Sequence, residues 1–83
     1  MYRIVLARTA KKDIASLDKK QKTRVIAALL DLRKDPYMGK KLKGKLRNYY
    51  SLRVLPYRII YGIDKPDKTI FIIRIGHRRG VYQ

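Results

Sequence analysis

The fold is decided by residues 57–76, which read YRIIYGIDKPDKTIFIIRIG. Two runs rich in β-branched and aromatic residues, Tyr57–Asp64 and Thr69–Gly76, flank the polar tetrad Lys65-Pro66-Asp67-Lys68. Such runs favour strands, and proline and aspartate between them are typical of a turn. The stretch therefore predicts two consecutive strands joined by a tight connection.

Alternation along each strand predicts which side chains reach the core, because successive side chains point to opposite faces. In the first strand the apolar side carries Tyr57, Ile59, Tyr61 and Ile63. In the second strand the apolar side carries Phe71, Ile73 and Ile75. We expect these two sets to pack against the helices.

The opposite side of the strands carries arginine. A preceding strand, Tyr49–Leu55, ends at Pro56 and places Ser51 and Arg53 opposite Leu52 and Val54. If the three strands form a meander, four arginines converge on the face that the helices leave open: Arg53, Arg58, Arg74 and Arg78.

The N-terminal part predicts a strand followed by two helices. Tyr2–Leu6 has strand composition, and Thr9 is a candidate cap for a helix over Ala10–Leu17 with Ala10, Ile14 and Leu17 on its apolar face. Asp18, with Gln21 three residues later, resembles a capping box for a second helix. Its apolar stripe is Val25, Leu29 and Leu32, with Ile26 and Leu30 beside it. Asp35-Pro36 ends this helix, and a basic loop, Tyr37–Asn48, follows.

Composition indicates a polyanionic partner. The 83 residues carry a net charge of +16, from 22 lysines and arginines against 6 acids. No acid lies between Pro36 and Ile63, so the acids avoid the region with the candidate site. The absence of cysteine excludes disulfides, cysteine-ligated zinc and thiol catalysis. We expect one domain over residues 1–83, a cytoplasmic location, and no metal, small-molecule cofactor or membrane span.

Residues 76–83, GHRRGVYQ, follow the last predicted strand and combine arginine with histidine and tyrosine. Guanidinium groups bind phosphates through a planar fork of donors. A neighbouring tyrosine or histidine can stack on a base or transfer a proton. The combination indicates an RNA site, and one where RNA is cut.

The order of short motifs along nearly the whole chain resembles the RelE/ParE superfamily of toxins from toxin–antitoxin modules. The motifs are Leu32-Arg33-Lys34-Asp35-Pro36, Lys41-Leu42-Lys43-Gly44, Tyr50-Ser51-Leu52-Arg53-Val54, Tyr57-Arg58-Ile59-Ile60-Tyr61 and residues 75–82. The resemblance implies an α/β (α+β) fold of order β-α-α-β-β-β. Its mostly antiparallel, four-stranded sheet is covered on one face by the helical hairpin.

The resemblance to the RelE branch implies a toxin that cleaves messenger RNA in the ribosomal A site, without a metal, by attack of a 2′-hydroxyl on the phosphate. It assigns the catalytic positions to Arg53, Arg58, Arg78 and Tyr82. RelE proteins often carry a lysine where this chain has Ser51, and some relatives use a glutamate base, a residue type absent here. An acidic antitoxin is the implied partner, alongside the ribosome and messenger RNA.

The residues leave the identity of the general base open. Neighbouring guanidiniums would lower the pKa of the Tyr82 phenol from its ordinary value of about 10, which makes it a candidate base. His77 is an alternative, although strand alternation points it away from Arg78, and a lysine is a third candidate. The remaining basic residues are expected to bind RNA: Lys40, Lys41, Lys43, Lys45, Arg47, Arg74 and Arg79.

Two other functions stay open at this point. The ParE branch inhibits DNA gyrase and is a protein-binding module without catalysis. A degenerate, RNA-binding toxin remnant is the third reading, suggested by Ser51 and the missing glutamate. The convergent arginines favour the nuclease, because a gyrase binder has no need of phosphate ligands.

Overall fold

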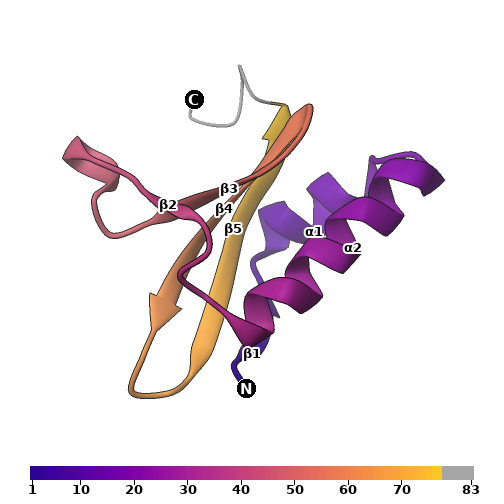
Figure 1. Cartoon of the computed structure of the whole chain (residues 1–83). Helices are drawn as coiled ribbons and strands as arrows, with labels where there is room; N and C mark the ends of the chain where they lie inside the picture. The colour runs from indigo at the N-terminus through magenta and orange to yellow at the C-terminus, as the bar shows by residue number, and fades with distance from the viewer. Residues whose placement is uncertain (78–83) are drawn as a thin grey trace.

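The computed structural model describes residues 1–77, in which two helices cover one face of a five-stranded sheet (Figure 1). The helices are α1 (Arg8–Ala15) and α2 (Lys19–Lys34). A short 3₁₀ helix spans Gly44–Leu46. The strands are β1 (Arg3–Leu6), β2 (Lys40–Lys41), β3 (Tyr50–Val54), β4 (Tyr57–Asp64) and β5 (Thr69–His77).

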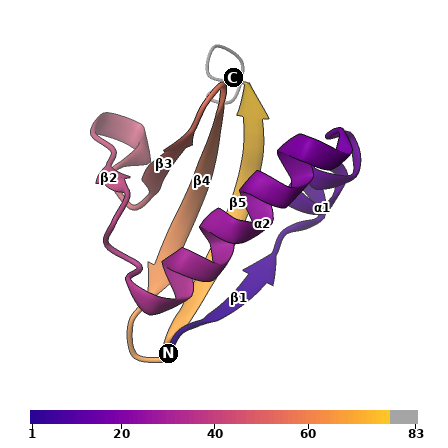
Figure 2. The ribbon, with the colours of Figure 1, turned by 45° about the vertical axis from the view of Figure 1, so that its right-hand side comes forward.

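The strand order across the sheet is β1-β5-β4-β3-β2, so β1 and β2 form its two edges (Figure 2). β1 pairs with β5 in parallel, and the other neighbours are antiparallel. The α/β class, the meander and the helical hairpin on one face are confirmed. The expected count of four strands is wrong, because Lys40 and Lys41 in the predicted loop pair with Tyr50 and Ser51 as a fifth strand.

The two helices begin in different ways. Asp18 caps α2 as expected, since its carboxylate accepts a hydrogen bond from the Gln21 amide at 2.8 Å. The expected cap of α1 is wrong: α1 begins after Ala7, and the Thr9 hydroxyl instead donates to the Ile73 carbonyl at 2.7 Å. α2 ends at Lys34, before the Asp35-Pro36 pair, as the sequence predicts.

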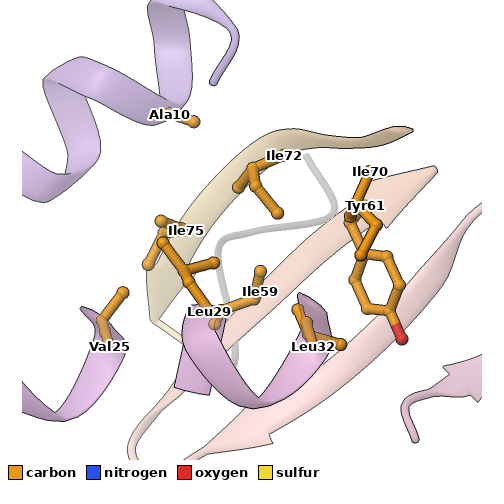
Figure 3. Packing of buried hydrophobic residues seen from close by; sticks show 9 residues of the cluster. All are labelled: Ala10, Val25, Leu29, Leu32, Ile59, Tyr61, Ile70, Ile72 and Ile75. Carbon is orange, nitrogen blue, oxygen red and sulfur yellow. The ribbon is translucent and has the colours of Figure 1, made fainter. Parts of the chain in front are cut away.

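The core lies between the helices and the sheet (Figure 3). The predicted stripe Val25, Leu29 and Leu32 is buried, whereas Ile26 and Leu30 beside it stay exposed. The buried cluster consists of Ala10, Val25, Leu29 and Leu32 from the helices and Ile59, Tyr61, Ile70, Ile72 and Ile75 from the strands. Burial of these apolar side chains is the main term that stabilises the fold.

An irregularity in β5 changes which of its residues face the core. Ile60 of β4 pairs with Arg74, but the next residue, Tyr61, pairs with Ile72, so Ile73 is an extra residue. One extra residue reverses the alternation on either side of it. Ile70 and Ile72 therefore face the helices, and the expectation for Phe71 and Ile73 is wrong while that for Ile75 is confirmed. Because residues 70–73 are all apolar, the sequence gives no sign of where the alternation reverses.

Candidate nucleic-acid interface

A basic groove runs along the open face of the sheet beside β2. One part has a volume of about 300 Å³ and is lined by Lys40, Lys41, Leu42, Lys43, Ser51 and Arg58. A neighbouring part of about 260 Å³ is lined by Met38, Gly39, Lys40, Ser51, Leu52, Arg53 and Arg58. We call the two parts together the basic groove. None of these lining residues is acidic, so the groove concentrates positive potential where a phosphate could bind.

Arg58 lies where the two parts of the basic groove meet. Its strand register places it directly opposite Arg53 of β3 and Gly76 of β5. Two like charges in a cross-strand pair repel each other, which favours an anion between them. The Arg58 Nε atom is buried and, within residues 1–77, has no hydrogen-bond partner. An unsatisfied buried donor costs free energy, so this N–H is suited to a phosphate oxygen.

Ser51 orients Arg58 at the floor of the groove. It is only 4% exposed, and its hydroxyl accepts a hydrogen bond from Arg58 Nη1 at 3.3 Å. A lysine at this position, as in many RelE proteins, could not accept that bond because an ammonium is only a donor. The sequence placed Ser51 on the open face but did not reveal this contact.

The lysine-bearing segment that forms one wall is attached to the core through Tyr61. The Tyr61 hydroxyl donates to the Pro36 carbonyl at 2.8 Å and accepts from the Gly39 amide at 3.0 Å. A Cβ atom on Gly39 would collide with this hydroxyl, so the close approach requires glycine. Burial raises the pKa of Tyr61 to about 12, against a smaller opposing effect of the Gly39 amide. Tyr61 is thus a neutral anchor that places Lys40 and Lys41, a role that sequence analysis missed.

Arg74 does not join the basic groove. The register puts it opposite Ile60, on the open side as expected, but its Nε donates to the Asp13 carboxylate of α1 at 2.9 Å. The same carboxylate accepts from the Ile75 amide at 2.8 Å. β1 pairs with β5 only as far as Ile72, so Thr9 and Asp13 replace a strand partner beyond that point. Asp13, which lies far from the candidate site in the sequence, thus pairs in space with one of the four arginines expected to converge there.

His77 ends β5 next to Gly76, the partner of Arg58, but its side chain belongs to the opposite face of the sheet from Arg58. It pairs with Tyr57, and the two rings meet edge to face with centroids 6.1 Å apart. Tyr57 belongs to the helix-facing side of β4, so His77 shares that side, in agreement with strand alternation. The structure therefore separates this candidate base from the basic groove.

The other predicted site residues have varied positions. Lys45 lies in the 3₁₀ helix and Arg47 directly follows it, and both are exposed outside the groove lining. Arg78, Arg79 and Tyr82 lie outside the described residues. Within residues 1–77 no cluster of metal-ligating side chains is present. The described helices also include none that is long and apolar enough to cross a membrane.

Comparisons with known proteins agree on one group of relatives. A family model described as "ParE toxin of type II toxin-antitoxin system, parDE" matches residues 4–82. Toxin RelG of Mycobacterium tuberculosis is 32% identical over 88 residues, covering 99% of this chain and 97% of RelG. Both matches span nearly the entire chain, so they concern the whole fold and not one motif.

Solved structures agree with the sequence matches. The toxin–antitoxin complex RelBE2 from Mycobacterium tuberculosis gives a TM-score of 0.76 at 32% identity, covering 93% of this chain and 98% of that chain. The archaeal RelE–RelB complex from Pyrococcus horikoshii gives 0.81 at 26% identity, covering 96% and 98%. The chain belongs to the ParE toxin family, within the RelE/ParE superfamily of type II toxin–antitoxin toxins.

Proposed function

We propose that this toxin is an endoribonuclease that cleaves messenger RNA in the ribosomal A site. The observation that carries the proposal is the half-buried Arg58, which lines a groove of cations without acidic lining residues and whose buried Nε has no hydrogen-bond partner within residues 1–77. Such a donor set suits a phosphodiester, which bears one negative charge and gains another in the transition state.

The proposed reaction is an attack of the 2′-oxygen on the adjacent phosphorus. The bond from phosphorus to the 5′-oxygen breaks, which leaves a 2′,3′-cyclic phosphate on one fragment and a 5′-hydroxyl on the other. A base takes the 2′ proton, and an acid supplies a proton to the leaving 5′-oxygen. Arg58 stabilises the extra charge on the phosphorane, and Arg53 opposite it holds the scissile phosphate.

Lysine is the only candidate for the general base that the described groove lining contains. Among residues 1–77 that lining contains lysine, arginine, serine and aliphatic side chains together with Met38 and Gly39. We assign the base to Tyr82 and a second phosphate ligand to Arg78, on the resemblance to RelE toxins. His77 is the less favoured base because it lies on the helix-facing side.

The ribosome supplies the alignment that the toxin lacks. The basic groove offers phosphate ligands but few groups that could hold a flexible RNA in line for attack. A message held by the ribosome presents its backbone in one geometry, which is a proximity effect. We therefore expect efficient cleavage of translated messages and little cleavage of free RNA.

We further propose an acidic antitoxin as the partner. The relatives from Mycobacterium tuberculosis and Pyrococcus horikoshii were solved as complexes with antitoxins. A chain with a net charge of +16 attracts an acidic partner over a long range, and salt should slow that association. We place both proteins in the cytoplasm, where ribosomes and messages are available.

Gyrase inhibition is the second candidate function. The description of the matching family model as a ParE toxin favours it. A degenerate RNA-binding remnant is the third candidate, suggested by Ser51. Because the Ser51 hydroxyl accepts a hydrogen bond from Arg58, Ser51 contributes to the site, which argues against a remnant. Inhibition of supercoiling with intact messages would move the assignment to gyrase.

Primer extension on a message translated in a purified system tests the proposal. We expect cuts within codons in the parent and uncut message for Arg58→Ala. Tyr82→Phe retains a ring but loses the hydroxyl, whereas Tyr82→Ala loses both. If Tyr82 is the base, both variants should lose about a hundredfold or more in single-turnover rate. Equal cutting of free and translated RNA, or parent activity in both variants, would contradict these assignments.

A further inference from the structure

A second feature of the open face lies beside the basic groove. Val5 of β1 pairs with Phe71 of β5, and Phe71 pairs with Gly62 of β4. The Tyr49 ring, just before β3, lies beside Gly62, 3.6 Å from where a Cβ atom would be. We call these four residues the aromatic row. It crosses the sheet at right angles to the strands, on the side that the helices do not cover.

Exposure distinguishes the aromatic row from the core. Val5 and Phe71 are each 40% exposed, although both belong to strands whose neighbouring residues are fully buried or packed on the core. The irregularity at Ile73 is what turns Phe71 to this side. Val5 and Phe71 are cross-strand neighbours, so their exposed parts form one apolar patch, and a patch of this kind can bind a ligand.

Gly62 lies between Phe71 and the Tyr49 ring in the aromatic row. Its backbone does not have a positive φ, so the conformation does not require glycine. Among the described residues, a Cβ atom there would meet only the Tyr49 ring, at ordinary contact distances of 3.6 and 3.7 Å. Neither strain nor crowding therefore accounts for glycine. The absent side chain lets the Tyr49 ring lie close to the Gly62 backbone.

We propose that the aromatic row is a stacking platform for a nucleobase of the single-stranded RNA whose phosphate lies in the basic groove. The inference rests on the proposed function and extends it to a second contact. Gly62 and Arg58 share one face of β4 and are four residues apart, about 13 Å at roughly 3.3 Å per residue. A neighbouring nucleotide of the same strand can span that distance.

The charges on the open face indicate toward which side of the aromatic row the bound RNA extends. From the aromatic row toward the basic groove, the open face leads to Ser51, Arg58 and Arg53. In the opposite direction the guanidinium of Arg3 is already paired with the Asp67 carboxylate at 2.7 Å. Proteins that bind single strands combine a cationic track with aromatic rings, because every base has a face that can stack. The open face has this combination.

The test uses a short, fluorescent 2′-O-methyl oligoribonucleotide, which cannot be cleaved, and measures its affinity by anisotropy. Phe71→Leu keeps an apolar side chain but removes the ring, and we expect about a tenfold loss in affinity. The salt dependence of binding should stay unchanged, because no phosphate contact is lost. In contrast, Arg53→Ala should reduce the salt slope by about one. Leu30→Ala, an exposed apolar residue of α2, is the matched control and should bind as the parent does.

A probe with one abasic position separates stacking from other effects of Phe71. Scanning the abasic position along the probe should reveal one site where the parent also loses about tenfold. At that site Phe71→Leu should add no further loss. Parent-like binding by Phe71→Leu, or the same loss with every abasic probe, would overturn the inference. Unchanged RNA binding with weakened antitoxin binding would also overturn it and assign the row to the protein partner.

The outcome is separable from that of the nuclease proposal. Stacking on a probe that cannot be cut would persist if the toxin never cleaved RNA, and the platform would then stand without the nuclease. Cleavage at the parent rate by Phe71→Leu, together with unchanged affinity, would leave the nuclease standing without the platform.

Discussion

The helix-covered face of the sheet and its open face use the same strands for opposite purposes. Toward the helices, Ile59, Tyr61 and Ile72 are fully buried in the apolar cluster. Toward the open side, Arg58 faces Arg53 across the strand pair and keeps a buried Nε without a partner in the described chain. The helix-covered face stabilises the fold by excluding water. The open face keeps the repulsion between Arg53 and Arg58 and the unsatisfied Nε donor of Arg58. Changes on the two faces should therefore affect different measurements.

The largest expected effect is on the helix-covered face. Leu32 is fully buried, so Leu32→Ala should lower the free energy of unfolding by about 2–5 kcal/mol through lost burial and a cavity. Urea unfolding followed by circular dichroism measures this change. Leu30→Ala on the same helix is the control: Leu30 is 52% exposed, and its removal should cost about 0.5 kcal/mol or less. Equal losses in both variants would remove the distinction between the faces.

Arg58→Ala should show the reverse pattern on the open face. Cleavage should fall by about a hundredfold or more, because a transition-state charge ligand is lost. The melting temperature should stay near that of the parent, since within residues 1–77 the side chain makes one hydrogen bond, the 3.3 Å contact with Ser51. Arg8→Ala, an exposed arginine on α1, is the matched control for loss of one charge. An Arg58→Ala protein that is inactive because it is unfolded would contradict the comparison.

Tyr61→Phe should affect both the stability of the core and RNA binding on the open face. The ring stays in the core, but the Pro36 carbonyl and the Gly39 amide lose their partner. We expect a loss of about 1–3 kcal/mol in unfolding free energy and weaker RNA binding, because the segment with Lys40 and Lys41 is released. Tyr50→Phe, whose ring stacks on Tyr61, is the control for removing a tyrosine hydroxyl nearby. Reduced stability with unchanged RNA affinity would show that the anchor serves folding alone.

Alkaline pH should destabilise the folded protein through ionisation of Tyr61. The pKa of Tyr61 is raised to about 12 in the folded state, against an ordinary value of 10.0, so the folded protein holds this proton more tightly than the unfolded chain. This contribution to stability is complete below pH 10 and is lost as the pH rises to about 12. Tyr61→Phe should therefore lose less stability than the parent over that range. Absorbance titration should show one of the seven tyrosines ionising last, and ionisation of Tyr61 with the exposed ones would refute this.

The smallest expected effect is at the edge where the faces meet. Asp13→Asn keeps an oxygen that can accept from the Ile75 amide but removes the charge that faces Arg74. The Arg74 side chain is 39% exposed, so the ion pair is screened and its loss should cost about 0.5–1 kcal/mol. Urea unfolding at low and high salt checks this, and the difference from the parent should shrink as salt rises. A difference that is indifferent to salt would assign the effect to the hydrogen bond with Ile75.

Much of the fold was predictable because its determinants are local. The stripe Val25, Leu29 and Leu32 follows helical periodicity, and the Asp18 cap depends on a residue three positions away. The alternation in β4 correctly separated Arg58 from Ile59 and Tyr61, since that strand keeps its register. The order of motifs along the chain was sufficient to predict the superfamily.

The rest of the site was decided by contacts between residues far apart in the chain. Only the pairing of β4 with β5 shows the extra residue at Ile73, which turns Phe71 to the open face. Only the packing of α1 against the edge of β5 gives Arg74 an acidic partner. The Tyr61 anchor joins residues 22 positions apart through backbone groups whose partners are not encoded in a local pattern. The sequence by itself determined which segments are helix or strand, apart from β2, and that arginines gather on one face. The tertiary structure alone decided that, within residues 1–77, Arg74 has an acidic partner while Arg53 and Arg58 line a groove without one, because pairing depends on distance in space.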